Sequence, residues 1–261
     1  MVEGPQSSYL AKSIERKFKN RKIQKIEIKK GRYKSHPLKN IKPFQLSFPN
    51  RLNEVYKKGK VLFFFFTNWT LIVKLGMTGW FYFDDPVDGD IIFTFDNNKK
   101  LVFQDQRHFG TITITSDADQ VMKELEKIAP DVLDQRLSYD DLKDRILRLS
   151  PSKTIDTVLM DQQLFLSGIG NIIKSEILYD AKISPKRKVS ELESKDWRKI
   201  LSSAKKIAHL IYSELQKEKD TNEFLIVQKI YQREYDPKGN KVERFMSSDG
   251  RVSFWVPAIQ R

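Results

Sequence analysis

The chain contains no cysteine and only three histidines among its 261 residues. The lack of cysteine excludes disulfide bonds, a cysteine nucleophile and every zinc or iron–sulfur site with thiolate ligands. The histidines, at positions 36, 108 and 209, are far apart in the sequence, which argues against a histidine-rich metal centre. We therefore expect a protein that needs no metal and no other cofactor.

Long hydrophobic runs are missing too. The densest apolar stretch, 61–66, is far shorter than the roughly 18 residues of a membrane-spanning helix and is typical of a buried strand. The opening MVEGP has neither the basic nor the apolar region of a secretory signal. These two absences predict that the protein is neither secreted nor inserted in a membrane.

Positive charge is present in excess. The 47 Lys and Arg residues outnumber the 34 Asp and Glu residues, which gives a formal net charge of +13. Such a surplus indicates a polyanionic partner, with nucleic acid first and an anionic membrane second. A lysine-rich surface that only maintains solubility is the alternative explanation.

The apolar pattern predicts a strand-rich region first. Leu10, Ile14 and Phe18 recur at fourfold spacing, so a helix is expected there, capped by Ser7 or Ser8. Six short strands separated by turn signals are expected at 61–67, 71–75, 80–83, 91–95, 101–103 and 111–115. This spacing predicts an antiparallel sandwich or barrel, which we place at residues 1–130.

The pattern becomes helical from Asp117 onward and changes again in the tail. Helices are expected at 118–128, 139–149, 155–163, 171–181 and 194–219. The tail predicts strands at 224–233 and 251–256 and a turn at 237–240. The expected fold is therefore a multidomain α+β protein, with a β-sandwich flanked by a helix, a helical domain at 131–222 and a β-hairpin region at 223–261.

The most specific segment is LSGIGNIIKSE, at 166–176. Gly168 and Gly170 permit a tight turn directly before a helix. The free amides of a helix N-terminus, with the side chain of Asn171 as a further donor, predict a phosphate-binding site. An ordinary glycine-rich turn between helices is the alternative.

With the preceding Met-Asp-Gln, this segment resembles the helix–two-turns–helix (H2TH) of the formamidopyrimidine-DNA glycosylase and endonuclease VIII family. Other segments agree in the family's order, namely MVEGP, the Gly59-Lys60 strand, and the loops at 75–79 and 105–110. The tail at 251–260 resembles the family's C-terminal zinc finger without its cysteines. Val256 and Ile259 stand in place of one cysteine pair.

The resemblance implies a bifunctional DNA glycosylase and AP lyase of base excision repair. Val2, freed by removal of Met1, would attack C1′ of the damaged nucleoside and form a Schiff base. An α-amino group titrates near 8 and a lysine near about 10.4, so at pH 7 a far larger fraction of the α-amine than of a lysine is neutral and nucleophilic. Glu3 would transfer protons to and from the sugar, and Lys60 would hold a phosphate beside the lesion.

Further residues match the family's DNA contacts. Lys74, Asn171 and Arg251 would bind the DNA backbone. Met77, Arg107 and Phe109 would fill the space that a flipped base leaves in the duplex. Core packing is the alternative for Met77 and Phe109, and a solvated basic surface is the alternative for Lys60 and Arg251.

Four departures from the family pattern favour its endonuclease VIII-like branch. Gln6 stands where glutamate is frequent, Lys74 stands where some members have a phosphate-binding histidine, Asp156 replaces a lysine, and the segment 216–222 is short. We therefore expect oxidised pyrimidines, ring-opened bases and hydantoins as substrates in preference to 8-oxoguanine. An N-terminal valine and a zincless finger also occur in eukaryotic-type and large-virus members of the family.

The expected partner is damaged DNA, duplex or single-stranded. The protein is expected to be a monomer inside the cell, in the nucleus, the cytoplasm or a viral factory. The other functional hypothesis is a lesion- or junction-binding protein with the same scaffold and little or no catalysis. A basic helix-turn-helix regulator would leave MVEGP and the tail unexplained.

Overall fold

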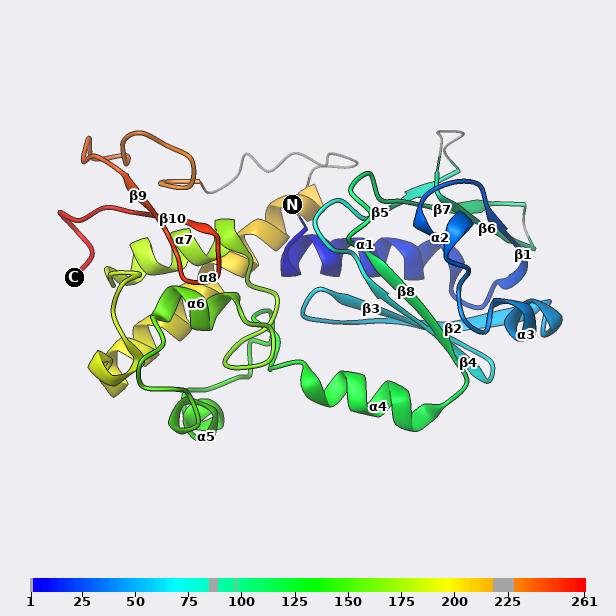
Figure 1. Cartoon of the computed structure of the whole chain (residues 1–261), viewed down its shortest axis with the longest axis horizontal. Coiled ribbons are helices and arrows are strands. Elements are labelled where there is room, and N and C mark those ends of the chain that lie inside the picture. The colour runs from blue at the N-terminus through cyan, green and yellow to red at the C-terminus, as the bar shows by residue number, and fades with distance from the viewer. Residues whose placement is uncertain (1, 85–88, 97, 218–227) are drawn as a thin grey trace. The chain divides into compact units, whose positions relative to one another are not determined.

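The structure is a computed structural model that describes residues 2–84, 89–96, 98–217 and 228–261 (Figure 1). It divides the chain into two compact units where the sequence predicted three regions. The first unit contains residues 1–2 and 6–127, and the second contains residues 3–5 and 128–261. The tail therefore belongs to the same unit as the helices, and so does the short segment Glu3–Pro5. The predicted boundary at 222 lies outside the described residues.

An eight-stranded antiparallel sheet forms the frame of the first unit. The strands are β1 (Lys22–Ile28), β2 (Asn50–Lys58), β3 (Val61–Phe66), β4 (Trp69–Lys74), β5 (Trp80–Phe83), β6 (Ile91–Phe95), β7 (Lys100–Gln104) and β8 (Thr111–Thr115). Their order in the sheet is β5-β7-β6-β1-β2-β3-β4-β8. All the strands expected from the sequence in this region are confirmed, and β5, β6 and β8 have the predicted bounds.

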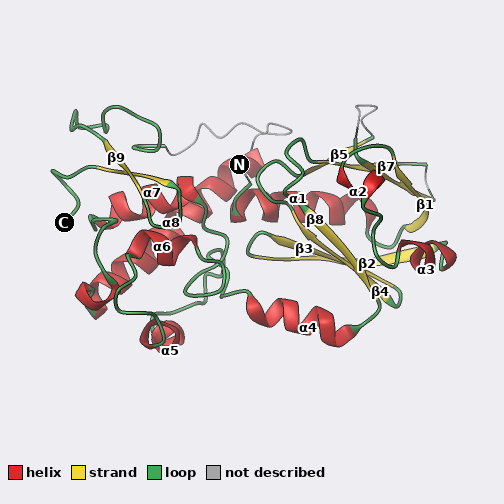
Figure 2. Cartoon of the chain, in the orientation of Figure 1, coloured by secondary structure: helices red, strands yellow, loops and turns green. Residues whose placement is uncertain are grey.

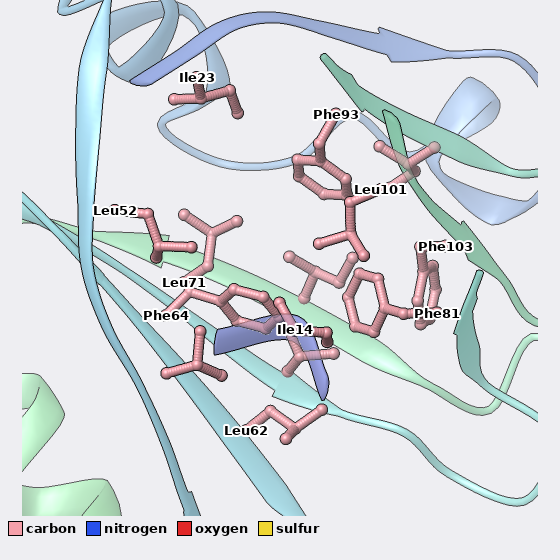
Figure 3. Close-up of a cluster of buried hydrophobic side chains, with 14 of the residues drawn as sticks. Ile14, Ile23, Leu52, Leu62, Phe64, Leu71, Phe81, Phe93, Leu101 and Phe103 are labelled. Atoms are coloured by element: carbon pink, nitrogen blue, oxygen red, sulfur yellow. The ribbon is translucent and has the colours of Figure 1, made fainter. Parts of the chain in front are cut away.

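The sheet folds into two halves around a shared core, as the predicted sandwich requires. Side chains of β3 and β4 face those of β5, β6 and β7, and the rings of Phe64 and Phe81 lie 5.3 Å apart (Figure 3). Helix α1 (Gly4–Phe18) contributes Leu10, Ile14 and Phe18 to this core. It begins before the predicted caps Ser7 and Ser8, which lie inside the helix, so the capping prediction was wrong.

Two strands were missed in the sequence because each contains a register shift. The shifts lie between Ile23 and Lys25 in β1 and between Leu52 and Glu54 in β2. A bulge inserts one residue, so successive inward side chains are three positions apart instead of two, and the alternation that identifies a strand is lost. The short helices α2 (Arg32–Ser35) and α3 (Ile41–Leu46) were missed as well, whereas α4 (Ala118–Lys127) was predicted.

The second unit is mainly helical (Figure 2). Its helices are α5 (Lys143–Leu147), α6 (Ile155–Met160), α7 (Asn171–Ala181) and α8 (Ser194–Lys217), with short 3-10 turns at Asp140–Leu142 and Val189–Glu191. Helix α7 has the predicted bounds. The predicted end of the last helix, at 219, lies outside the described residues. Among the residues that the structure describes, no helix is both long and apolar enough to cross a membrane.

The tail forms a hairpin of β9 (Glu243–Met246) and β10 (Val252–Trp255). The prediction of a strand at 224–233 is wrong for residues 228–233, which contain bends and a turn. The rest of that predicted strand, 224–227, lies outside the described residues. The amides of Lys229, Ile230 and Tyr231 donate instead to the buried carboxylate of Glu176, each at 3.0 Å. Burial raises the pKa of Glu176, which these three donors oppose.

Apolar packing holds the tail together. Val242 and Val256 pack with Ile230 and Tyr179, and Phe254 and Ile259 join them. Two other aromatic residues of the tail, Phe245 and Trp255, have the ammonium of Lys186 over their rings, at 5.0 and 4.7 Å from the ring centres.

The predicted turn at 237–240 is built around the carboxylate of Asp236. It accepts hydrogen bonds from the amides of Lys238 and Asn240 and from the Asn240 side chain. The hydroxyl of Tyr179 also donates to it at 2.9 Å. Burial and this bond raise the pKa of Tyr179 to about 12. Within the described residues, no cluster of three potential metal-binding side chains occurs.

Candidate active site

Glu3 is held by the N-terminus of helix α7. Its side chain is fully buried, its Oε1 accepts a hydrogen bond from the amide of Ile172 at 2.9 Å, and its Oε2 accepts one from Ile173 at 3.0 Å. These amides have no partner within the helix, and the positive end of the helix stabilises an anion. The amides that were predicted to be free for phosphate are therefore occupied by a carboxylate of the same chain.

The Gly-Ile-Gly turn brings Glu3 to this helix end. Gly168 has a φ of +90°, and its carbonyl accepts a hydrogen bond from the amide of Gly4 at 2.7 Å. A Cβ atom at Gly170 would overlap the carboxylate of Glu3. Both glycines are thus required for the segment after Val2 to pack against the turn, a contact between residues about 170 positions apart that sequence reasoning did not find.

Asn171, the first residue of α7, links the helix to the tail hairpin. Its Nδ2 donates to the carbonyl of Val252 at 2.9 Å, and only 6% of the residue is exposed. The predicted contact of Asn171 with DNA thus involves a side chain that already makes one hydrogen bond within the protein.

Arg251 lies at the tip of the β9–β10 hairpin, directly before the first residue of β10. The turn is closed by hydrogen bonds between Ser247 and Arg251 and between Gly250 and Ser247, of 2.8 and 3.0 Å. Gly250 has a φ of +76°, which a glycine adopts without strain. The exposed guanidinium lies 3.0 Å from the carboxylate of Asp249, so Arg251 can exchange this partner for a phosphate.

Two adjacent loops of the first unit contain the three predicted void-filling residues. Met77 is half-buried, whereas Arg107 and Phe109 are exposed, and the Arg107 guanidinium lies 4.9 Å from the centre of the Phe109 ring. An exposed phenylalanine beside a guanidinium is a group that can stack on a base or fill its place.

A buried aspartate, which sequence reasoning missed, joins these loops. Asp105 accepts from the hydroxyl of Thr78 and from the amide of Gly110, each at 2.5 Å, and the Thr78 hydroxyl accepts from the amide of Arg107 at 3.1 Å. Asp105 therefore fixes one loop against the other. The only sequence signal was its place at the start of the second loop, directly after a strand.

The remaining predicted residues of the first unit have different surroundings. Val2 is 8% exposed and packs in the hydrophobic core. Lys60 is half-buried and lies in the two-residue turn between β2 and β3, not in the strand itself. Lys74, at the end of β4, lies 2.5 Å from the carboxylate of Glu124 in α4. Lys74, which was predicted to bind DNA, therefore already pairs with a carboxylate of the protein.

Two family models match the chain. The formamidopyrimidine-DNA glycosylase N-terminal domain matches residues 1–112, and the formamidopyrimidine-DNA glycosylase H2TH domain matches residues 128–223. The chain belongs to the formamidopyrimidine-DNA glycosylase family. The resemblance drawn from the sequence motifs is therefore confirmed at the level of the family.

Individual members of this family match over part of their length. A formamidopyrimidine-DNA glycosylase of Listeria monocytogenes is 33% identical over 159 residues, which are 59% of this chain and 57% of that protein. One of Ureaplasma parvum is 36% identical over 181 residues, or 65% of each chain. The match thus spans less than two thirds of these relatives.

Solved structures of the family share the fold over nearly the whole chain. A complex of Lactococcus lactis Fpg with DNA that contains an abasic site superposes with a TM-score of 0.83 at 22% identity, covering 99% of both chains. MutM in complex with DNA that contains carbocyclic 8-oxo-G gives a TM-score of 0.83 at 21% identity over the same coverage. The predicted fold class is therefore confirmed.

Proposed function

We propose that the protein is a DNA glycosylase with AP lyase activity that removes oxidised bases. The observation that carries the proposal is the position of Glu3, whose carboxylate is fixed at the N-terminus of α7 directly after Val2 in the sequence. A general acid–base group adjacent to a primary amine is what attack on C1′ and later elimination require.

In the first step, the neutral amine of Val2 attacks C1′ and the damaged base departs with the bonding electrons. Glu3 supplies a proton to the ring oxygen as the sugar opens, the attacking amine gives up one proton, which neutralises the departing base, and the nitrogen becomes a protonated Schiff base with C1′. The protonated imine then withdraws electrons, so the Glu3 carboxylate, which has given up its proton, takes one from C2′ and the 3′ phosphate is eliminated. Water releases the DNA and restores the amine.

The other residues bind DNA around this reaction. Lys60, a cation at a hairpin turn, contacts a phosphate close to the lesion, and Arg251, a cation at another hairpin turn, contacts phosphates beside the extruded nucleotide. Lys74 and Asn171 add further backbone contacts, Lys74 after exchanging Glu124 for a phosphate. Met77, Arg107 and Phe109 occupy the space vacated by the base, which offsets the few kcal/mol lost in unstacking it.

The substrate class follows from the residues around the reaction. The uncharged Gln6 and the buried Asp156 replace groups associated with oxidised guanine. We propose that oxidised pyrimidines, ring-opened purines and hydantoins are removed faster than 8-oxoguanine. The partner is damaged DNA, and no metal takes part.

Single-turnover excision on duplex and single-stranded oligonucleotides, each with one lesion, tests this proposal. We expect release of 5-hydroxyuracil, formamidopyrimidine and hydantoin bases, followed by strand cleavage. Tight binding to lesions without release of any base would instead favour the alternative of a lesion-binding protein.

Arg251→Ala is expected to lower single-turnover excision on duplex DNA by more than about tenfold, because a bidentate phosphate contact contributes roughly 1.5–3 kcal/mol. An abasic site, which has no base to extrude, should be cleaved with a smaller loss. The slope of log affinity against log salt concentration should decrease by the equivalent of about one phosphate contact.

The control for this prediction is Arg244→Ala, which removes another exposed arginine of the same hairpin. It should change affinity only slightly. If Arg251→Ala excises bases like the wild type at saturating protein, Arg251 is a surface cation with no positioning role.

A further inference from the structure

The second unit contains a buried ion network that the proposed mechanism does not use. Lys174 is 1% exposed and its Nζ donates to the hydroxyl of Ser253 at 2.7 Å. Ser253 donates in turn to Asp156, also 1% exposed, at 2.9 Å. The hydroxyl of Ser247 donates to the same carboxylate oxygen.

This network joins three elements. Asp156 lies on α6, Lys174 lies on α7, and the two serines lie on either side of the hairpin turn that carries Arg251. Asp156 is itself fixed from its own helix, because its Oδ1 accepts from Thr154 at 2.5 Å and from the amide of Thr157 at 2.8 Å. The hairpin is thus held at both sides of its tip by charges buried in the helical part of the unit.

The surroundings of Lys174 are unfavourable for a cation. It lies in the first turn of α7, where the helix dipole is positive, and it is removed from water. Burial lowers the pKa of Lys174, and the Asp156 carboxylate opposes that shift. Residues that break local preferences in this way are concentrated at functional sites.

We propose that Lys174 is a positioning residue that, through Ser253 and Asp156, fixes the hairpin so that Arg251 meets the DNA phosphate. Lys174 itself does not touch DNA. The inference rests on the proposed function and on the assigned role of Arg251. Asp156, which stands where the family pattern has a lysine, then has a structural role, because its carboxylate is the counterion of the lysine buried in the neighbouring helix.

A double-mutant cycle between Lys174→Met and Arg251→Ala tests the proposal. Lys174→Met leaves Asp156 buried without its cation, so the hairpin loses its fixed position. Single-turnover excision and affinity for duplex DNA containing a tetrahydrofuran site should each fall about tenfold, whereas the double variant should be within about threefold of Arg251→Ala alone. If the two residues acted independently, their losses of about tenfold each would multiply to about a hundredfold loss in the double variant.

Two controls separate positioning from a general loss of stability. Lys206→Met removes an exposed lysine of the same unit that pairs with Asp180 at 2.8 Å, and it should leave excision unchanged. The loss of excision caused by Lys60→Ala should multiply with the loss caused by Lys174→Met, because Lys60 belongs to the other unit. If Lys174→Met does not fold, Ser253→Ala provides the same cycle, since it removes the hydroxyl link between Lys174 and Asp156 while both charges stay in place.

The outcomes distinguish this inference from the proposed function. A wild-type protein that binds tetrahydrofuran DNA but excises nothing refutes the function, and the cycle is then read from affinity alone. Multiplicative losses in an active enzyme refute the positioning role and leave the function intact. A wild-type protein that binds no DNA refutes both.

Discussion

Replacing Glu3 with glutamine is expected to lower single-turnover base excision by about 10²–10⁴-fold, the usual contribution of a general acid–base group. Glutamine has nearly the same shape but cannot release or accept a proton at this position. One end of its amide is also a donor, so it opposes the amide of either Ile172 or Ile173 instead of accepting from it. Affinity for tetrahydrofuran DNA should fall much less than excision.

The control for this variant is Glu176→Gln. Glu176 is another buried carboxylate that accepts backbone hydrogen bonds, but it lies on α7 itself and binds the amides of residues 229–231. It should lower the melting temperature while excision per folded molecule falls less than about tenfold. The catalytic role is refuted if Glu3→Gln excises bases within tenfold of the wild type.

Gly170→Ala is expected to have an effect almost as large, although it changes a residue with no side chain. The new methyl group would occupy the space of the Glu3 carboxylate, so Glu3 has to leave the α7 amides. Two buried amides then lack partners, at a cost of roughly 1–3 kcal/mol each. Melting temperature and excision should therefore both fall, and excision by about a hundredfold or more.

A comparison variant and a double variant make this prediction specific. Gly239→Ala introduces a methyl group at another glycine, one with open space around it, so only its positive φ of +82° opposes the change. It should cost about 1 kcal/mol of stability and leave excision unchanged. Glu3→Gln combined with Gly170→Ala should excise no more slowly than the worse single variant, because both disrupt one contact. A fully active Gly170→Ala variant would contradict the account.

Sequence reasoning succeeded where local chemistry determines the structure. Helix α7 has its predicted bounds because two glycines precede it and Pro185 follows shortly after its end. The strand predicted at 251–256 is confirmed as β10, and it follows glycine and small polar residues that favour a turn. Strands β1 and β2 were missed for an equally local reason, since each contains a bulge that breaks the alternation.

The parts that could not be predicted depend on contacts distant in sequence. Glu3 was identified as a candidate proton donor, but its partners Ile172 and Ile173 are separated from it by 169 and 170 positions. Asp156 was noted only as a departure from the family pattern. Nothing near it in the sequence indicates that Lys174 is its counterion, because the connection runs through a serine of the distant tail.

The central claim is that the α-amine of Val2 is the nucleophile, and borohydride trapping tests it most directly. Untagged protein is incubated with lesion-containing or abasic duplex DNA and reduced, and the covalent adduct is digested and located by mass spectrometry. The account predicts an adduct on Val2, and none in a variant whose N-terminus is blocked by a preceding residue that is not removed. Equal trapping by the blocked variant, or an adduct on a lysine such as Lys60, would contradict it.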